Sequence, residues 1–406
     1  MTAVPGAEQS RNVEVVGYHD LEGRPAFKLA MQVVDSRWYL YLGHFWHRGW
    51  SVLDVTEPTS PRLAHFEPWG NENTWTLQVS LAQGLLVTAL EAIGGEAWGY
   101  NPSGPPFDTG VLIWDVHQPT EPRLLGRFDT GGTGTHRNFY DGGRYVHLAA
   151  RPDGYRGNIY LVIDIQGLAH PVEVSRWWFP GQWEAGEEEP PSDGASLHGP
   201  AYVEGDRAYL PYGRVGMIIL DISDIHKPKL VSQLSFGGLG SSLGVHTVLP
   251  IPSRQLALVN TEAILEDGKD PLNYAAIVDI ADEHNPRVLS FYPVPVPAPE
   301  IPYRNFAQKG GRFGPHNQHM PHHQDCLMLV ENLTYLTYFN AGLRIYDISD
   351  PSIPQEVGYF VPEDPAERRG LLPTKLVVQS EDVLVDARGN IYLTDKNHGL
   401  FILRYT

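Results

Sequence analysis

The stretch MIILDISDIHKP, residues 217–228, combines a short apolar run, an Asp, a polar turn and a Pro. Five further segments repeat this order: SVLDVTEPTSP (51–61), VLIWDVHQPTEP (111–122), YLVIDIQGLAHP (160–171), AAIVDIADEHNP (275–286) and LRIYDISDPSIP (343–354). In all six segments the Pro follows the Asp by seven residues, and successive aspartates are 61, 49, 57, 58 and 68 residues apart. An internal repeat near this period indicates an array of similar structural units.

Each part of the repeat has a predicted structural role. The apolar run is typical of a buried strand. The Asp is expected to accept a backbone N–H bond in the turn that follows, because its short side chain reaches two residues on. The Pro lacks an N–H and suits the first residue of an outer edge strand. With the hairpin that precedes each apolar run, the unit becomes a four-stranded antiparallel blade, and the chain an all-β propeller.

The two ends of the chain predict how the ring closes. Residues 13–19 (VEVVGYH) match the outer-strand segment QEVGYF, whereas residues 400–406 (LFILRYT) match the Asp strand, with Arg404 in place of the Asp. The last blade therefore lacks an outer strand, which residues 13–19 are expected to supply, leaving no free edge. The prediction is one domain over residues 1–406, a seven-bladed propeller of four-stranded antiparallel blades.

Three insertions exceed the minimal blade, and loops of such length are commonly functional. They are residues 93–110, 180–195 and 293–320. The repeat itself, with its D[IV] strand, turn, Pro and "VG" segments, resembles the LVIVD-repeat family of β-propellers over nearly the whole chain. The resemblance implies the fold and no particular activity, because propellers host unrelated functions.

Composition excludes several classes of function. The net charge of −18 disfavours nucleic acid and anionic membranes as partners. The single cysteine, Cys326, excludes a disulfide framework and a Cys-rich zinc site. The first residues, MTAVPGAEQSRN, lack the apolar segment of a signal peptide, and no apolar run of 18 residues occurs. We therefore expect a cytoplasmic protein; no pattern indicates its oligomeric state.

Histidines recur at the start of the innermost strand. Alignment of the blades on their hairpin turns gives His136, His198 and His246 in the third, fourth and fifth blades. The sixth blade offers GPHNQHMPHHQD (314–325), in which His316, His322 and His323 are the ligand candidates. Buried imidazoles are costly unless both nitrogens are satisfied, and imidazoles that converge from adjacent blades suit a divalent transition metal such as iron or zinc.

A purely structural role for these histidines is the alternative. The first, second and seventh blades keep the repeat without the histidine, so the fold itself does not require it. Loops between the second and third strands open on the same face and supply Glu91, Arg151, Arg214 and Glu262 as further catalytic candidates. The carboxylates could orient ligating imidazoles or carry protons, and the arginines could hold an anionic or carbonyl group of a substrate.

Two functions from different classes follow. The first is a metal-dependent enzyme (hydrolase, lyase, isomerase or oxygenase) acting on a small apolar or aromatic molecule, since tryptophans and tyrosines are plentiful near the histidines. This layout is similar to that of carotenoid-cleavage oxygenases and selenium-binding proteins, which are seven-bladed propellers with axial histidines. The second is a non-catalytic binding module whose acidic surface suits a basic protein partner. Polar groups concentrated inside the ring favour the enzyme.

Overall fold

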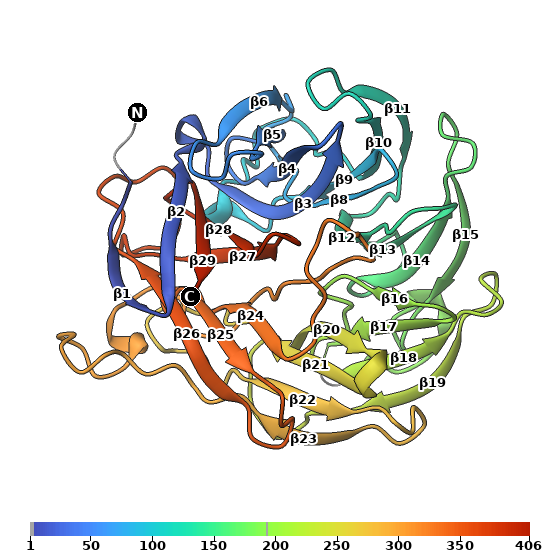
Figure 1. Ribbon diagram of the computed structural model, residues 1–406. Helices are drawn as coiled ribbons and strands as arrows, with labels where there is room; N and C mark the ends of the chain where they lie inside the picture. Colours follow the sequence, from blue (N-terminus) through green and yellow to red (C-terminus); the bar gives the residue numbers. More distant parts are fainter. Residues whose placement is uncertain (1–3, 192–193) are drawn as a thin grey trace.

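The computed structural model describes residues 4–191 and 194–406, and these are built almost entirely from antiparallel β-strands. Figure 1 shows the sheets arranged around a common centre in chain order. The helices of the described residues are single 3-10 turns: η1 (Leu21–Gly23), η2 (Glu96–Trp98), η3 (Glu184–Gly186), η4 (Pro252–Arg254) and η5 (Phe306–Gln308). Within the described ranges, no helix has the length and apolar character needed to cross a membrane.

The sheets of the first, fourth and fifth repeat units each follow the predicted order of four consecutive antiparallel strands. The first is β3 (Ala26–Val34), β4 (Arg37–His44), β5 (Trp50–Asp54) and β6 (Arg62–Glu67). The fourth is β16 (Tyr202–Glu204), β17 (Arg207–Pro211), β18 (Met217–Asp221) and β19 (Lys229–Leu234). The fifth is β20 (Val245–Ile251), β21 (Leu256–Thr261), β22 (Ala275–Asp279) and β23 (Arg287–Phe291).

The second and third units are joined into one nine-stranded sheet. The second unit is β8 (Val79–Ala82), β9 (Leu85–Ala92), β10 (Gly110–Asp115) and β11 (Arg123–Phe128), with β7 (Thr74–Trp75) also paired to β9. The third is β12 (Gly134–Phe139), β13 (Tyr145–Arg151), β14 (Ile159–Asp164) and β15 (Val172–Trp177). Because the pair Gly134–Glu91 links the two units, the count of seven separate blades stays a prediction.

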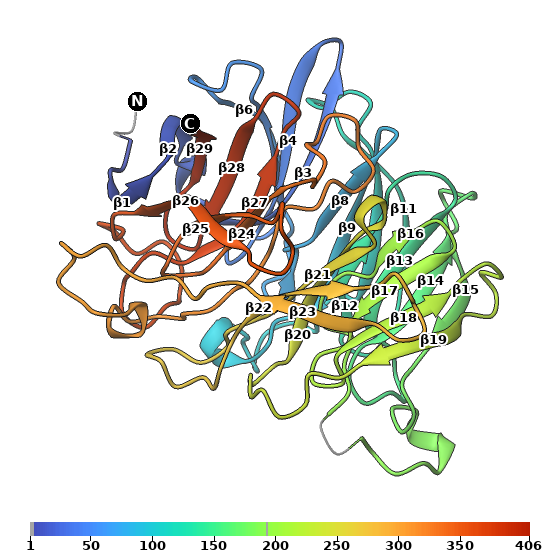
Figure 2. The ribbon, with the colours of Figure 1, turned by 60° about the horizontal axis from the view of Figure 1, so that its bottom comes forward.

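The last two units take strands from the N-terminus. The sixth is β24 (Leu333–Thr337), β25 (Leu343–Asp347), β26 (Gln355–Pro362) and β1 (Ala7–Arg11). The seventh is β27 (Ser380–Val385), β28 (Asn390–Asp395), β29 (Leu400–Tyr405) and β2 (Val13–His19). Figure 2 shows β1 and β2 beside β26 and β29.

Ring closure by residues 13–19 is confirmed, because β2 pairs antiparallel with β29 from Val13–Tyr405 to His19–Leu400. Two features of the sixth unit were not predicted. Strand β1 lies outside β26, and its sequence AEQSR lacks the apolar alternation that would have marked it. The inner strand of this unit is reduced to the isolated bridge between Gln318 and Leu336.

The turn of the repeat is confirmed in all six copies. Each Asp accepts a hydrogen bond from the backbone N–H two residues on, at 2.7–3.1 Å. The position of the Pro is corrected by one residue: the outer strand begins just after it, as at Arg62, which lies opposite Asp54. Proline has no N–H, so it lies immediately outside the hydrogen-bonded ladder.

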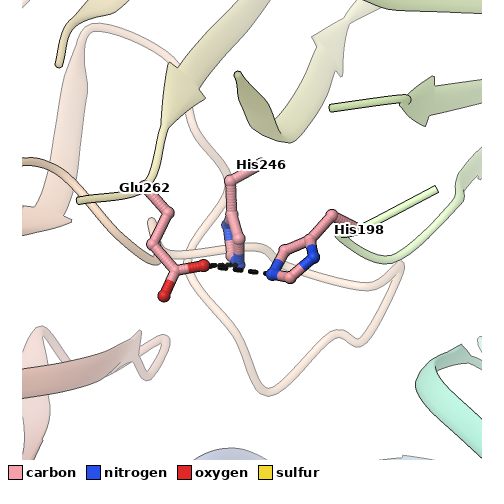
Figure 3. Close-up of side chains that lie close together, drawn as sticks. All are labelled: His198, His246 and Glu262. Carbon is pink, nitrogen blue, oxygen red and sulfur yellow. Dashed lines mark hydrogen bonds and ion pairs between the residues drawn. The ribbon is translucent and has the colours of Figure 1, made fainter. Parts of the chain in front are cut away.

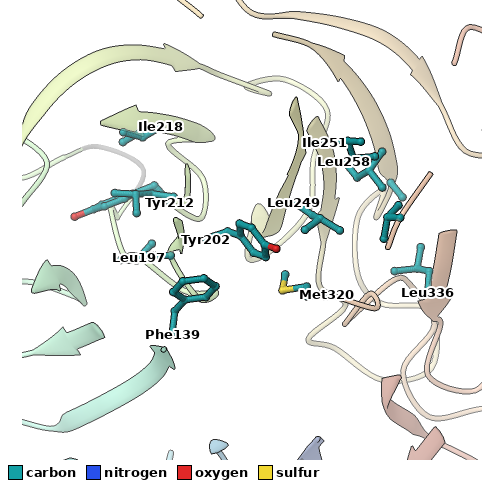
Figure 4. Close-up of a cluster of buried hydrophobic side chains, with 14 of the residues drawn as sticks. Phe139, Leu197, Tyr202, Tyr212, Ile218, Leu249, Ile251, Leu258, Met320 and Leu336 are labelled. Atoms are coloured by element: carbon teal, nitrogen blue, oxygen red, sulfur yellow. The ribbon is translucent and has the colours of Figure 1, made fainter. Parts of the chain in front are cut away.

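Apolar side chains between neighbouring sheets form the core. Figure 4 shows the largest cluster, in which Phe139, Tyr202 and Leu249 come from the third, fourth and fifth units. At the periphery, the outer strand of one unit touches the turn of the next. Gly126 on β11 lies so near the Leu168 carbonyl that a Cβ would come within 1.9 Å of its oxygen.

Candidate metal centre

Four imidazoles from consecutive units meet on one face of the ring. His136 lies on β12, His198 precedes β16, His246 lies on β20, and His316 precedes the Gln318 bridge. Ring centroids are 4.4 Å apart for His136 and His198, 5.4 Å for His198 and His246, and 4.9 Å for His246 and His316. The structure thus brings together four of the six histidines that the sequence offered as ligands.

Irregular strand pairing aims these side chains. The register of β12 on β13 shifts between Thr135 and Arg137, and that of β20 on β21 shifts between Val245 and Thr247. The residue inside each shift is a histidine. A β-bulge leaves its extra residue out of the ladder and turns the side chain to a new direction. The bulges therefore direct His136 and His246 toward the cluster.

Glu262, which follows β21, lies at the centre of the cluster. Its Oε2 is 3.1 Å from His198 Nε2 and 3.6 Å from His246 Nε2, and its Oε1 is 3.7 Å from His316 Nε2. Figure 3 shows His198, His246 and Glu262 pointing toward one another. One ligand atom from each of these three residues lies within 4.8 Å of the other two, a spacing that could accommodate a metal ion.

Three ring nitrogens that face away from the cluster each lie near a polar group, although His316 Nδ1 forms no hydrogen bond. His136 Nδ1 is 2.9 Å from both oxygens of Glu91, and His316 Nδ1 is 3.3 Å from Glu381 Oε2. His246 Nδ1 is 2.9 Å from Thr247 Oγ1. The Nε2 atoms consequently face the shared space, and those of His136 and His198 are 3.3 Å apart. Metal-binding histidines are commonly oriented in this way by a carboxylate or another polar group.

Burial sets the protonation of the cluster. It lowers the pKa of His136, His246 and His316 well below the usual value, so these imidazoles are neutral near pH 7. Burial alone would raise the pKa of Glu262, but the surrounding imidazoles, His316 foremost, lower it well below its usual range. Burial raises the pKa of Glu91 to about 7. Neutral imidazoles and an ionised carboxylate are the forms that bind metal ions.

A cavity of about 190 Å³ opens beside the cluster. Its apolar lining is mostly aromatic. The first and second units supply Phe27, Phe45, Trp75, Leu77 and Trp98, and the fifth unit adds Ile264. Trp98 belongs to the 93–110 insertion, and the 293–320 insertion contributes Arg312 and His316. The 180–195 insertion contributes none of the cavity-lining residues identified within the described ranges; its residues 192 and 193 lie outside those ranges.

Two predicted ligands lie elsewhere. His323 is 36% exposed at its side chain and its Nε2 is 2.8 Å from the Val203 carbonyl. His322 packs beside Phe139 and Tyr202. These histidines follow His316 by six and seven residues, and an extended chain advances roughly 20 Å over that length. The sixth unit therefore presents His316 to the cluster and carries His322 and His323 away from it.

The two arginines predicted at the site do not line the cavity, and other cations line it instead. Arg151 and Arg214 are exposed, donate Nε to the carbonyls of Tyr155 and Ser242, and do not line the cavity. The cations that do line it are Arg137, Arg312 and Lys396. Arg137 was missed because strand alternation places it opposite His136, whereas the bulge brings both residues to the cavity.

The fold and this site define a β-propeller with a cluster of histidines on one face. More specifically, the chain carries the LVIVD repeat, whose family model matches residues 202–235 and 325–361, and this confirms the resemblance predicted from the sequence. A search of the curated proteins found no match.

Solved structures support the fold. A hypothetical selenium-binding protein from Sulfolobus tokodaii is similar with a TM-score of 0.55 and 14% identity, over 93% of this chain and 90% of that one. A Lactobacillus plantarum protein has a TM-score of 0.53 and 12% identity, over 94% and 98%. At these identities the likeness shows the fold alone.

Proposed function

We propose that this chain is a metal-dependent enzyme that acts on a small organic molecule in the cavity beside the histidine cluster. A divalent transition metal, iron or zinc, would be held by His136, His198, His246 and His316, with Glu262 as a further ligand or proton carrier. The observation that carries the proposal is the orientation of the imidazoles: three have Nδ1 facing a carboxylate or hydroxyl while Nε2 faces the shared space.

The spacing of the donor atoms supports this assignment. Ligand nitrogens about 2.1 Å from a tetrahedral ion lie about 3.4 Å from one another. The Nε2 atoms of His136 and His198 are 3.3 Å apart, and Glu262 Oε2 is 3.1 Å from His198 Nε2. Imidazole suits iron and zinc alike, so the donor set favours either metal over magnesium or calcium, which prefer oxygen ligands.

A bound ion of this kind could polarise a carbonyl group or activate water or dioxygen. Glu91 would keep the His136 ring in place through Nδ1, and Glu381 would face Nδ1 of His316. The aromatic wall would exclude bulk water and accept the apolar part of a substrate. Hydrolase, lyase, isomerase and oxygenase chemistry all remain compatible with this arrangement.

Metal analysis of the purified full-length chain tests the proposal. We expect about one equivalent of iron or zinc per chain by plasma mass spectrometry. In His198→Ala we expect that content to fall at least tenfold, because this residue contacts both His136 and Glu262. The matched control is His117→Ala, since His117 lies in a repeat turn with 68% of its side chain exposed.

Metal content far below one equivalent that does not change in His198→Ala would contradict the proposal. Cobalt substitution provides a second measurement, because a cobalt(II) ion bound by imidazoles absorbs visible light. The absorption spectrum of the cobalt-loaded His117→Ala variant should equal that of the unmodified chain. A stoichiometric protein partner recovered with a metal-free chain would favour the non-catalytic binding module instead.

A further inference from the structure

Arg137 is a buried cation that faces the cavity. The residue is 4% exposed, and its guanidinium donates Nη1 to the His136 carbonyl at 3.0 Å and Nη2 to His246 Nε2 at 3.2 Å. Among the residues that the structure describes, no carboxylate oxygen lies within 4.0 Å of it. Glu262, Glu91, Asp382 and Glu381 attract this charge only from beyond ion-pair distance. A buried cation without a direct partner is unfavourable for the protein alone.

The other two cavity cations differ from Arg137 in this respect. Arg312 Nη1 donates to Glu262 Oε1 at 3.0 Å, and Lys396 forms an ion pair with Glu381. Glu91, the remaining carboxylate in contact with the cluster, is directed to His136. The acidic groups closest to the cluster thus pair directly with other residues, whereas Arg137 has no direct ion pair within the described ranges. Its guanidinium is therefore available to bind an anionic group in the cavity.

A metal at the proposed site would increase the need for an anionic group in the cavity. The lone pair of His246 Nε2 that accepts from Arg137 is the one that a metal would take, so both cannot use it together. With the metal bound, Arg137 would keep only the His136 carbonyl among its present partners. A divalent ion and a guanidinium on one side of a small cavity then favour an anionic group between them.

Resting on the proposed function, we infer that the substrate is a small carboxylate with an aromatic or apolar body, whose anionic group is held by Arg137. The guanidinium fork matches a carboxylate in a bidentate manner. Arg137 also lies 5.3 Å from the Phe27 ring, which begins the aromatic wall. The body of the substrate lies along this wall, where Phe27 and Phe45 are 5.0 Å apart and Trp75 and Trp98 are 5.6 Å apart.

The volume of the cavity limits the size of this molecule. The cavity measures about 190 Å³. Pockets for drug-sized ligands begin near about 300 Å³. The cavity therefore fits a substrate of one ring, such as an arylcarboxylate, rather than a long polyene or a peptide.

Calorimetric titration of the metal-loaded full-length chain tests the inference with benzoate and its neutral isostere benzamide. We expect benzoate to bind at least tenfold more tightly than benzamide. Arg137→Gln should abolish this preference, because the variant keeps hydrogen-bond donors but loses the charge. Arg151→Gln is the matched control and should retain the preference, because Arg151 is exposed and lies outside the cavity lining.

Several outcomes separate this inference from the proposed function. Equal binding of benzoate and benzamide to the unmodified chain overturns the inference whatever the variants do, and so does an unchanged preference in Arg137→Gln. A benzoate preference that requires Arg137 in a chain that holds no metal supports the inference and contradicts the metal-dependent enzyme. If circular dichroism shows that Arg137→Gln is unfolded, Arg137→Lys replaces it; this variant keeps the charge and should retain part of the preference.

Discussion

The carboxylates of the repeat aspartates are occupied by donors within their own turns. Asp115 accepts from His117 Nδ1 at 2.8 Å, from the His117 backbone N–H at 3.1 Å and from Arg123. The His117 side chain and Arg123 lower the pKa of Asp115 to about 2. The pKa is lowered in the other five repeats as well: Asp54, Asp164, Asp221, Asp279 and Asp347.

The lowered pKa values of these aspartates predict how the stability of the protein depends on pH. A carboxyl whose folded pKa lies below its unfolded value stabilises the protein above about pH 4 and loses this contribution as the pH falls toward 2. We expect the free energy of unfolding, measured with urea, to decrease over that interval. Asp115→Asn should cost about 1 kcal/mol at pH 7 after solvent screening, and less at pH 2.

Glu367→Gln is the control for Asp115→Asn, because Glu367 is exposed and has no ion pair among those found in the described ranges. It should leave the pH dependence unchanged. Superimposable pH profiles for Asp115→Asn and the unmodified chain would show that the Asp115 turn does not contribute to acid stability.

At the scale of the elements, the fourth residue of the outer strands forms the contact between neighbouring units. It is Gly126 in β11, beside the Leu168 carbonyl, and Ser175 in β15, whose Oγ donates to the Ile225 carbonyl at 2.6 Å. In β23, Ser290 Oγ donates to the Pro351 carbonyl, also at 2.6 Å. The carbonyl oxygen of the next turn therefore meets either a glycine, which has no Cβ to clash with it, or a serine hydroxyl, which donates a hydrogen bond to it.

Replacement of Gly126 by Ala tests this contact. The added methyl group would come within 1.9 Å of the Leu168 oxygen, so the two units must move apart, at a cost of about 1–3 kcal/mol or more. Gly70→Ala is the control, because a Cβ there has nothing within 4 Å, and its effect should stay within about 0.5 kcal/mol. Urea unfolding measures both, and equal stabilities would contradict the proposed contact.

The sequence predicts the elements better than it predicts the site. Apolar runs, turns and the Asp–Pro spacing depend on local chemistry, and they correctly predicted the order of strands and the closure by residues 13–19. The bulges of β12 and β20 could not be predicted, because nothing in the alternation of THRNF or VHTV marks an extra residue. This explains why Arg137 was missed although His136 was found.

The sixth unit shows the same limit for the histidines. Its inner segment forms only one bridge, Gln318–Leu336, so there was no strand pattern from which to fix the level of each histidine along the axis. His322 and His323 are nearest the expected strand, whereas His316 and His319 lie in the insertion, so the sequence did not decide which of these histidines is the ligand. The structure places His316 in the cluster, where its ring lies against His246 and Phe339.

At the scale of the whole molecule, the N-terminal segment connects two units. Strand β1 pairs with β26 of the sixth unit and strand β2 pairs with β29 of the seventh. A side-chain contact also joins β1 to the 293–320 insertion, because Gln9 Nε2 donates to the Tyr303 hydroxyl at 2.9 Å. The segment thus covers two strand edges that would otherwise be open to pairing with another chain.

Two truncations separate these roles. A variant lacking residues 1–12 keeps β2 and should fold, with a melting temperature lowered by several degrees because the edge of β26 is uncovered. A variant lacking residues 1–19 loses β2 as well and should aggregate, because the ring then stays open at β29. Circular dichroism and size-exclusion chromatography compare the two, and a monomeric, cooperatively melting variant without residues 1–19 would contradict closure by β2.

The residues around the cavity come from distant parts of the chain, from Phe27 in the first unit to Lys396 in the seventh. During synthesis on the ribosome, the pocket would therefore be completed only after the seventh unit, which carries Lys396, has emerged. A nascent or prematurely terminated product would display several of the histidines without their full set of carboxylate neighbours, and so would lack the assembled centre. Assembly of the cavity would then report that the seventh unit has been made.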